Sequence, residues 1–177
     1  NIEILPTGYD PEYFKPEGKK EGIVLTVAPT SAYGRKGIPL FLEVAKKLPE
    51  YQFVIVGNGL SFKASLNVTY TGHLSDKNLL KYYQRAKVYC QLSYHEGLPN
   101  ALCEAMLCEC VPVGTLRNGI PKAIGDTGYI VKVGDVENTV KAVWLAMSSD
   151  GKCARERIKD MFPLENRRKR LYEIFNK

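Results

Sequence analysis

Two patterns of hydrophobic and polar positions alternate along the chain. Short runs rich in Val, Ile and Phe are typical of buried β-strands, and between them apolar residues recur every three or four positions, which indicates amphipathic helices. Six runs predict strands: Ile23–Ala28, Phe53–Gly57, Val68–Thr71, Val88–Leu92, Val111–Gly114 and Tyr129–Val133. Strands that alternate with helices predict βα units. We therefore expect a doubly wound, Rossmann-like α/β domain, with a parallel sheet of about six strands flanked by helices.

The helical segments have recognisable starts and apolar faces. Helices are predicted over Pro39–Leu48, from Ser75 as N-cap to Ala86, over Pro99–Leu107, from Asp135 to Met147, over Lys152–Met161 and over Pro163–Asn176. Pro99 suits the first position of a helix, because proline has no N–H to leave unpaired there. Trp144 falls in the apolar stripe of the helix that Asp135 opens, so we predict that Trp144 is a core residue.

Composition supports one compact domain over residues 1–177. The chain has a mass of 19.9 kDa, with 45% hydrophobic and 25% charged residues. No apolar run approaches the roughly 18 residues that a membrane-spanning helix needs. The sequence begins at Asn1 without Met or a signal-like segment, and we expect it to be part of a longer, cytoplasmic protein.

The positive charge is concentrated near the C-terminus. The formal net charge is +6, from 25 basic and 19 acidic residues, and positions 152–177 hold nine of the basic and four of the acidic ones. A groove for nucleic acid is not indicated, because the rest of the chain is nearly neutral. The run Arg167–Arg170 is typical of a solvated helix face, with contact to acidic lipid or to a neighbouring domain as the alternatives.

The five cysteines predict neither a disulfide framework nor a metal site. Their number is odd and small for a domain of this size, which favours reduced thiols. Cys103, Cys108 and Cys110 lie close in sequence but lack the Cys-x2-Cys spacing of zinc sites, so we expect them to act as small buried hydrophobic residues.

Three loops follow predicted strands, where folds of this class bind ligands. In the first loop, Gly34 and Gly37 flank Arg35 and Lys36, which is a plausible cradle for an anion; the alternative is a solvated basic turn. The loop matches neither G-x-G-x-x-G nor the P-loop, which argues against dehydrogenase-type dinucleotide binding and Walker-type ATP hydrolysis. The second loop, Gly57-Asn58-Gly59, is a turn that either approaches a ligand or only reverses the chain.

The third loop runs from Ser93 to Asn100 and continues into the helix that contains Glu104. Glu96 and Glu104 both lie near the N-terminus of that helix. Its unpaired N–H groups suit phosphate or sugar hydroxyls, and two carboxylates suit a polyhydroxy ligand. Glu104 also has a structural explanation, since an early carboxylate complements the helix dipole.

These residues resemble a known family. The stretch Ser93-Tyr94-His95-Glu96-Gly97-Leu98-Pro99-Asn100-Ala101-Leu102-Cys103-Glu104-Ala105-Met106 is similar to the E-x7-E signature of the retaining, family 4 glycosyltransferases of GT-B fold (glycosyl transferases group 1). The resemblance covers nearly the whole chain. It extends to Leu5–Asp10 with Phe14-Lys15-Pro16, Lys36-Gly37, Val54–Gly59 and Gly72–Asp76. The chain departs from the family pattern at Val27-Ala28-Pro29, where Val-Gly-Arg is usual, at Glu109, where glycine is common, and at Lys122, where glutamate is frequent.

The resemblance implies a site for a nucleotide-diphosphate sugar. By analogy Glu96 contacts the donor sugar and Lys36 the diphosphate, and these two residues are the catalytic candidates. Arg35 stands in for the missing family arginine, Glu104 binds the ribose, and the backbone near Leu74 binds the base. The remaining implied binding residues are Gly57, Gly97, Leu98, Pro99, Asn100, Ala101 and Leu102.

The implied activity is that of the donor-binding, C-terminal half of a retaining glycosyltransferase. Residues 1–16 would connect to an N-terminal acceptor domain, and residues 163–176 would form a closing basic helix. No cofactor and no metal are expected, since no Asp-x-Asp motif is present. The expected partners are the nucleotide sugar and the acceptor domain, with peripheral membrane contact of the full protein left open. Alone, the domain should bind donor without transferring sugar. A two-carboxylate glycosidase, a non-catalytic nucleotide or glycan-phosphate module and a sugar-nucleotide epimerase are the alternatives.

Overall fold

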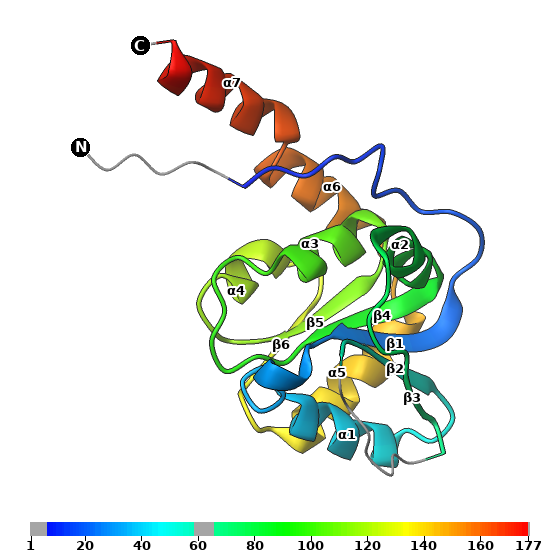
Figure 1. Ribbon diagram of the computed structural model, residues 1–177. Coiled ribbons are helices and arrows are strands. Elements are labelled where there is room, and N and C mark those ends of the chain that lie inside the picture. Colours follow the sequence, from blue (N-terminus) through cyan, green and yellow to red (C-terminus); the bar gives the residue numbers. More distant parts are fainter. Residues whose placement is uncertain (1–6, 59–65, 177) are drawn as a thin grey trace.

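The computed structural model describes residues 7–58 and 66–176 and is built on one parallel sheet (Figure 1). Its six strands lie in the order β3-β2-β1-β4-β5-β6. They are β1 (Glu21–Val27), β2 (Gln52–Val56), β3 (Val68–Tyr70), β4 (Ala86–Gln91), β5 (Val111–Thr115) and β6 (Tyr129–Val131). The six predicted strands and the doubly wound α/β class are confirmed. Residues 5, 6 and 59 of the family-like motifs lie outside the described residues.

Helices cover both faces of the sheet (Figure 1). They are α1 (Ile38–Lys47), α2 (Asp76–Arg85), α3 (Asn100–Leu107), α4 (Ile120–Ile124), α5 (Val136–Ser148), α6 (Lys152–Met161) and α7 (Leu164–Phe175), with a 3-10 turn η1 (Thr30–Ala32). Helix α4 and η1 were not predicted. Their five and three residues are too few to show a helical period in the sequence.

Strand alternation divides the core into two layers. On β1, Ile23 and Leu25 pack towards α2, α3, α4 and α6, whereas Val24 packs towards α1 and α5. Both layers are closely packed with side chains that exclude water, which is the main source of stability in such a domain. Because both faces of these strands are buried, they read in the sequence as continuous apolar runs, which predict the sheet.

The prediction that Trp144 is a core residue is wrong, because its side chain is 54% exposed. The buried positions of α5 are Thr139, Ala142, Val143 and Ala146. Trp144 follows Val143 directly and so lies about 100° further round the helix, at the edge of the buried face. The apolar stripe that the sequence of α5 predicts is therefore wider than the face of the helix that the sheet buries.

The predicted ends of the helices lie within one residue of those in the structure and differ from them only in detail. Pro99 is the N-cap of α3 rather than its first residue. Ser75 is the N-cap of α2, but its side chain makes no capping hydrogen bond within the described part of the chain. Ala86 begins β4 instead of ending the helix. Asp135 does cap α5, since its carboxylate accepts a hydrogen bond from the Asn138 N–H at 3.1 Å.

All five cysteines are free, and four of them are buried, with only Cys153 exposed. Burial raises the pKa of the Cys103 and Cys108 thiols to about 12, so both remain protonated at neutral pH. This agrees with the prediction of reduced cysteines, and Cys103, Cys108 and Cys110 lie inside the core cluster.

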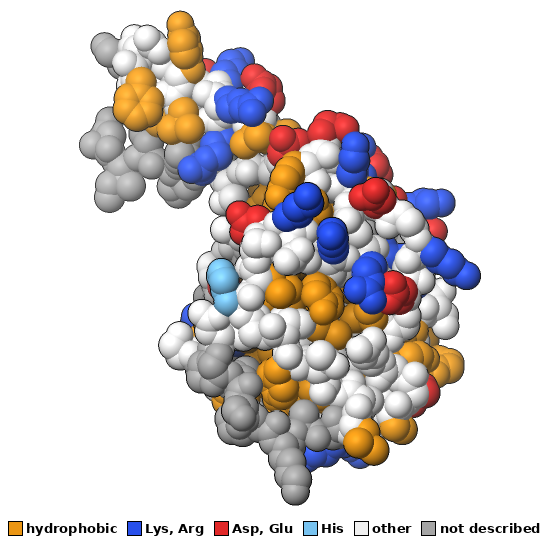
Figure 2. Space-filling model, turned by 45° about the vertical axis from the view of Figure 1, so that its right-hand side comes forward, with side chains coloured by type: hydrophobic (Ala, Val, Ile, Leu, Met, Phe, Trp, Pro, Cys, Tyr) orange, Lys and Arg blue, Asp and Glu red, His pale blue; other side chains and the backbone are white. Residues whose placement is uncertain are grey.

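The segment before β1 is held against α6. The Arg155 guanidinium donates to the carbonyl oxygens of Phe14 at 2.7 Å and Pro11 at 2.9 Å, and to that of Leu107 at the end of α3. Helix α7 extends beyond this contact, and none of its described residues is buried. On the face shown in Figure 2, acidic and basic side chains are interspersed and form no continuous basic surface. No helix among the described residues is both long and apolar enough to cross a membrane.

Helix α3 ends in a Schellman motif that has glutamate where glycine is favoured. The Cys110 N–H bonds to the Ala105 carbonyl at 3.0 Å and the Glu109 N–H to that of Met106 at 2.9 Å. Glu109 therefore adopts the left-handed region, with φ 63°. An L-residue there costs roughly 1–2 kcal/mol, which only glycine avoids.

We expect Glu109→Gly to stabilise the chain by about 0.5–1 kcal/mol. The relief of backbone strain should exceed the roughly 0.5–1 kcal/mol that glycine loses through the greater freedom of the unfolded chain. Urea unfolding measures the change, and Glu109→Ala, which keeps the strain, is the control. A Glu109→Gly variant no more stable than Glu109→Ala would contradict this account.

Candidate functional site

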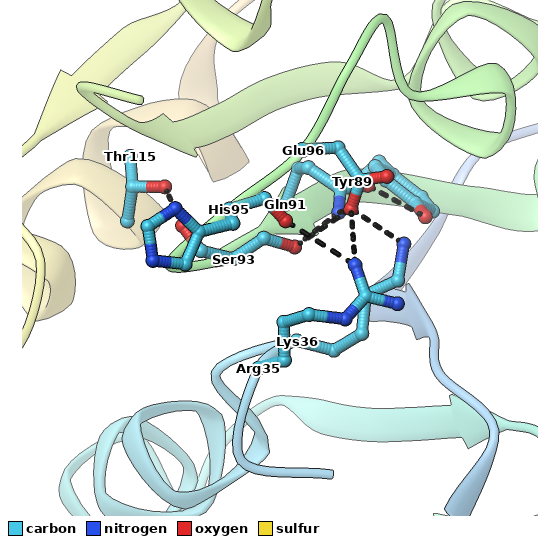
Figure 3. Close-up of polar contacts among 8 residues, drawn as sticks. All are labelled: Arg35, Lys36, Tyr89, Gln91, Ser93, His95, Glu96 and Thr115. Carbon is cyan, nitrogen blue, oxygen red and sulfur yellow. Dashed lines mark hydrogen bonds and ion pairs between the residues drawn. The ribbon is translucent and has the colours of Figure 1, made fainter. Parts of the chain in front are cut away.

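Lys36 and Glu96, 60 positions apart, meet at the carboxyl edge of the sheet (Figure 3). Lys36 lies in the loop between β1 and α1, and Glu96 lies in the loop between β4 and α3. The Lys36 Nζ is 2.7 Å from the Glu96 Oε2, and each side chain is only 15% exposed. Because little water surrounds the pair, its attraction is stronger than that of a surface ion pair.

Arg35 reinforces the contact between the two loops. Its Nη1 donates to the His95 carbonyl at 3.3 Å and lies 3.9 Å from the Glu96 Oε2. Its carbonyl accepts a hydrogen bond from the Tyr94 N–H at 2.8 Å. Arg35 is half exposed, so its charge faces solvent more than that of Lys36 does. The structure thus brings together both predicted cations and the predicted loop glutamate.

Gly37 permits this close approach of the loops. Its φ is +72°, and a Cβ at this position would lie 2.0 Å from the Leu92 carbonyl oxygen. Any side chain there would push the loop that carries Lys36 away from the end of β4. Gly37 of the predicted anion cradle thus allows the two loops to pack closely together.

Glu104 lies on α3 and is partly buried. Its Oε2 accepts a hydrogen bond from the Tyr83 hydroxyl at 3.1 Å. Burial raises the pKa of the Glu104 carboxyl above its usual value; the charge of Asp76 adds to the rise, and the bond from Tyr83 opposes it. Ionised Glu104 is therefore under-solvated in the absence of a ligand, and hydroxyl donors would be favourable partners for it.

The other predicted binding residues near the start of α3 range from exposed to buried. Asn100 begins α3, and its Oδ1 accepts a hydrogen bond from the Tyr9 hydroxyl at 2.9 Å. Leu102 and Pro99 are buried, so the Leu102 side chain belongs to the core and only its backbone remains for a ligand. Gly97 is exposed, whereas Leu98 and Ala101 are partly buried.

Gly57 and Leu74 lie at the same edge of the sheet, after β2 and β3. Gly57 packs against the backbone that follows β1, where a Cβ would lie 2.0 Å from the Ala28 carbonyl oxygen. Its N–H donates to the Gly72 carbonyl at 3.0 Å. Leu74 is partly exposed, with one side against the core. No interaction joins these two residues to Lys36 or Glu96 within the described part of the chain.

Two buried polar residues that were not predicted as site residues contact Glu96. Gln91 and Ser93, both buried, donate to the Glu96 Oε2 at 3.4 and 3.2 Å. The Thr115 hydroxyl donates to the Ser93 carbonyl at 2.6 Å. The available signal was Gln91 itself, a polar residue inside a run that otherwise predicts a buried strand. In residues 7–58 and 66–176, no cluster of three or more His, Cys, Asp or Glu residues could hold a metal ion.

Fold and geometry together define a doubly wound α/β domain with a cluster of charged side chains at the carboxyl ends of its central strands. The family model for "Glycosyl transferases group 1" matches residues 10–160. The chain belongs to this family.

The chain is also similar to individual relatives. It is 30% identical over 168 residues to a trehalose synthase from Thermococcus litoralis, an alignment that covers 78% of this chain and 40% of that protein. The structure of a sucrose-phosphate synthase from Thermosynechococcus elongatus aligns with a TM-score of 0.85 and 22% identity, over 98% of this chain and 52% of that one. The structure of Alr3699/HepE from Anabaena, solved in complex with UDP-glucose, aligns with a TM-score of 0.81 and 14% identity, over 96% and 56%. The sheet and helices match those of GT-B glycosyltransferases, and the chain spans about half the length of these structures.

We expect Glu104→Gln to raise the melting temperature of the ligand-free chain at pH 7. The raised pKa means that the ionised carboxyl destabilises the fold, and this effect disappears as the pH falls through the folded pKa towards the ordinary value of 4.5. The advantage of the variant should therefore shrink on acidification. Melting curves from pH 7 to pH 4 measure it, and a less stable variant at pH 7 would show that the carboxylate stabilises the fold.

Proposed function

We propose that this chain is the donor-binding domain of a retaining glycosyltransferase and binds a nucleotide-diphosphate sugar. The observation that carries the proposal is the contact between Lys36 and Glu96 beside the N-terminus of α3. A cation, a carboxylate and the first N–H groups of α3 would then be available to one ligand at the carboxyl edge of the sheet. Family membership supports the proposal, and so does the similarity to Alr3699/HepE, whose structure holds UDP-glucose.

Lys36 would bind the diphosphate, with Arg35 as a second cation. Sugar transfer develops negative charge on the leaving diphosphate, and a fixed cation stabilises that charge as it forms. One positioned donor of this kind is typically worth about 3–4 kcal/mol of barrier. The first N–H groups of α3, at the end of the loop that holds Gly97, would add partial positive charge.

Glu96 and Glu104 would bind different parts of the donor. Glu96 lies in the loop beside Lys36 and would accept hydrogen bonds from the sugar. Glu104 lies on the helix and would accept hydrogen bonds from the ribose. Gly57 and the backbone near Leu74 would lie on the side of the base, with Leu98, Pro99 and Asn100 lining the sugar-phosphate pocket.

Donor binding is proposed to need no metal, because Lys36 and Arg35 supply positive charge and the sequence has no Asp-x-Asp motif. Transfer would require an acceptor domain joined to this one. A non-catalytic module would bind the same ligands, and an epimerase would convert the donor without any acceptor. Turnover by the joined protein with and without an acceptor distinguishes the three. Calorimetry of this chain with UDP, GDP, ADP and their sugar conjugates tests donor binding first.

Lys36→Ala should weaken UDP binding by about 1.5–3 kcal/mol and leave the weaker binding of uridine nearly unchanged. The reason is that the ammonium group contacts phosphate and not the nucleoside. Calorimetry with UDP and uridine measures both affinities. Lys46→Ala removes an exposed lysine of α1 and serves as the matched control. If Arg35→Ala proves damaging and Lys36→Ala has no effect, Arg35 is the phosphate ligand instead.

The two glutamates should differ in which ligand they affect. Glu104→Gln should weaken UDP and UDP-glucose alike, by roughly 1.5–3 kcal/mol, through the lost charge-assisted bonds to the ribose. Glu96→Gln should weaken only UDP-glucose. Glu96→Gln should leave UDP binding unchanged or make it tighter, because Lys36 then has no ion pair to break before it contacts the phosphates.

Calorimetry of both variants with both ligands measures this division, and Glu50→Gln, at an exposed position, is the control. Equal losses for UDP and UDP-glucose in both variants would leave the glutamates with only a shared structural role at the start of α3.

A further inference from the structure

A chain of buried polar side chains leads from the middle of the sheet to Glu96 (Figure 3). Gln91 ends β4 and is 2% exposed, and Ser93 follows it at 0%. The Gln91 Nε2 donates to the Ser93 Oγ at 2.7 Å, and the Ser93 Oγ lies 3.2 Å from the Glu96 Oε2. The Tyr89 hydroxyl lies 3.4 Å from the Gln91 Oε1. Glu96 is thus connected to the core of the domain and not only to the opposite loop.

The chemistry of these groups fixes the direction of each hydrogen bond from Tyr89 to Glu96. A carboxylate only accepts, so the Ser93 hydroxyl must donate to Glu96 and accept from Gln91. The Gln91 amide must then present its NH2 group to Ser93 and its oxygen to the Tyr89 hydroxyl. Each donor has an acceptor in this arrangement, which is the condition under which buried polar groups are tolerated.

These polar groups are poorly explained by folding alone. Tyr89 and Gln91 occupy alternate positions of β4, which lies in the centre of the sheet between β1 and β5, and Ser93 is two residues beyond the end of that strand. An apolar residue at position 91 would satisfy the strand pattern without the desolvation of an amide. A role in orienting Glu96 would explain why these polar side chains are buried here.

The contacts of Glu96 converge on one of its two oxygens. Lys36, Ser93, Gln91 and Arg35 lie 2.7, 3.2, 3.4 and 3.9 Å from Oε2. Within the described residues, no protein group bonds to Oε1. The second oxygen is therefore the one left to accept a hydrogen bond from a ligand.

We propose that Gln91 and Ser93 are positioning residues that anchor the Glu96 Oε2 from the core side, so that Oε1 faces the donor sugar. The inference rests on the proposed donor role of Glu96. When Lys36 turns to the diphosphate, Oε2 loses its closest partner, and the bonds from Ser93 and Gln91 keep the carboxylate in place. The polar chain thus prepares Glu96 for the sugar independently of the cation that binds phosphate.

The test measures how much the sugar adds to nucleotide affinity. The full 177-residue chain is titrated with UDP-glucose, UDP-N-acetylglucosamine and GDP-mannose and with free UDP and GDP. The sugar nucleotide that binds best is carried forward with its nucleotide. Gln91→Met, which keeps the length but removes the amide, should weaken the sugar nucleotide about five- to tenfold and change the free nucleotide by less than about twofold.

Two further substitutions separate positioning from folding. Ser93→Ala should reduce the contribution of the sugar as Gln91→Met does, and Ser93→Thr, which keeps the hydroxyl, should restore it. Cys90→Ala is the matched control, because Cys90 is the neighbouring buried residue of β4 and packs into the opposite core layer. It should lower the melting temperature while leaving the ratio of the two affinities unchanged.

The failures of the two proposals are distinguishable. A wild-type chain that binds none of these probes overturns the proposed function and this inference with it. A wild-type chain whose affinity rises with the sugar, but whose ratio is unaffected by Gln91→Met and Ser93→Ala, overturns only the positioning role. A ratio that falls equally in Cys90→Ala assigns the effect to general destabilisation and also overturns it.

Discussion

The pairing of β1 with β4 at the centre of the sheet is the constraint on which the site depends. Leu25 lies opposite Tyr89 in parallel register, so the loops that follow these strands leave the sheet side by side. That adjacency brings Lys36 to Glu96 across 60 positions of sequence. The crossover helices on both faces make the arrangement possible, because parallel neighbours require long connections. A shift of either strand by one residue would turn its core side chains to the opposite face and separate the pair.

Burying charged groups at this edge of the sheet costs folding stability. Lys36 and Glu96 are both mostly removed from water, and partial burial of an ion pair repays its desolvation only when the geometry is good. The raised pKa of Glu104 shows a carboxyl that the fold leaves under-solvated. The apolar layers on the two faces of the sheet offset these effects. Polar groups gathered at one edge of an otherwise apolar fold are what a binding site requires, since they have their best partners only when a ligand is present.

The sequence was a good guide to elements and a poor one to contacts. Strand periodicity predicted the sheet, and loop chemistry together with the family resemblance selected Lys36 and Glu96. Period and loop position cannot show that the two side chains meet, because this depends on which strands are neighbours. Trp144 was misplaced since an apolar stripe does not reveal how much of a helix the sheet covers. Gln91 was overlooked because its neighbours carry the strand pattern, although a lone amide in a buried run needs partners and so points to a polar network.

The ion pair between Lys36 and Glu96 would also affect the affinity of the domain for a diphosphate. Lys36 is held by Glu96, and each of the two side chains is only 15% exposed. Binding a diphosphate would exchange one anionic partner of Lys36 for another, so only the difference between the two interactions contributes to affinity. The proposed exchange would need little reorganisation of the loops, because the Tyr94 N–H already bonds to the Arg35 carbonyl. If a diphosphate binds here as proposed, charges that neutralise each other beforehand would combine preorganisation with a tolerable cost in the free domain. In the proposed donor complex, Gln91 and Ser93 would contribute most once Lys36 had turned from Glu96 to the phosphates.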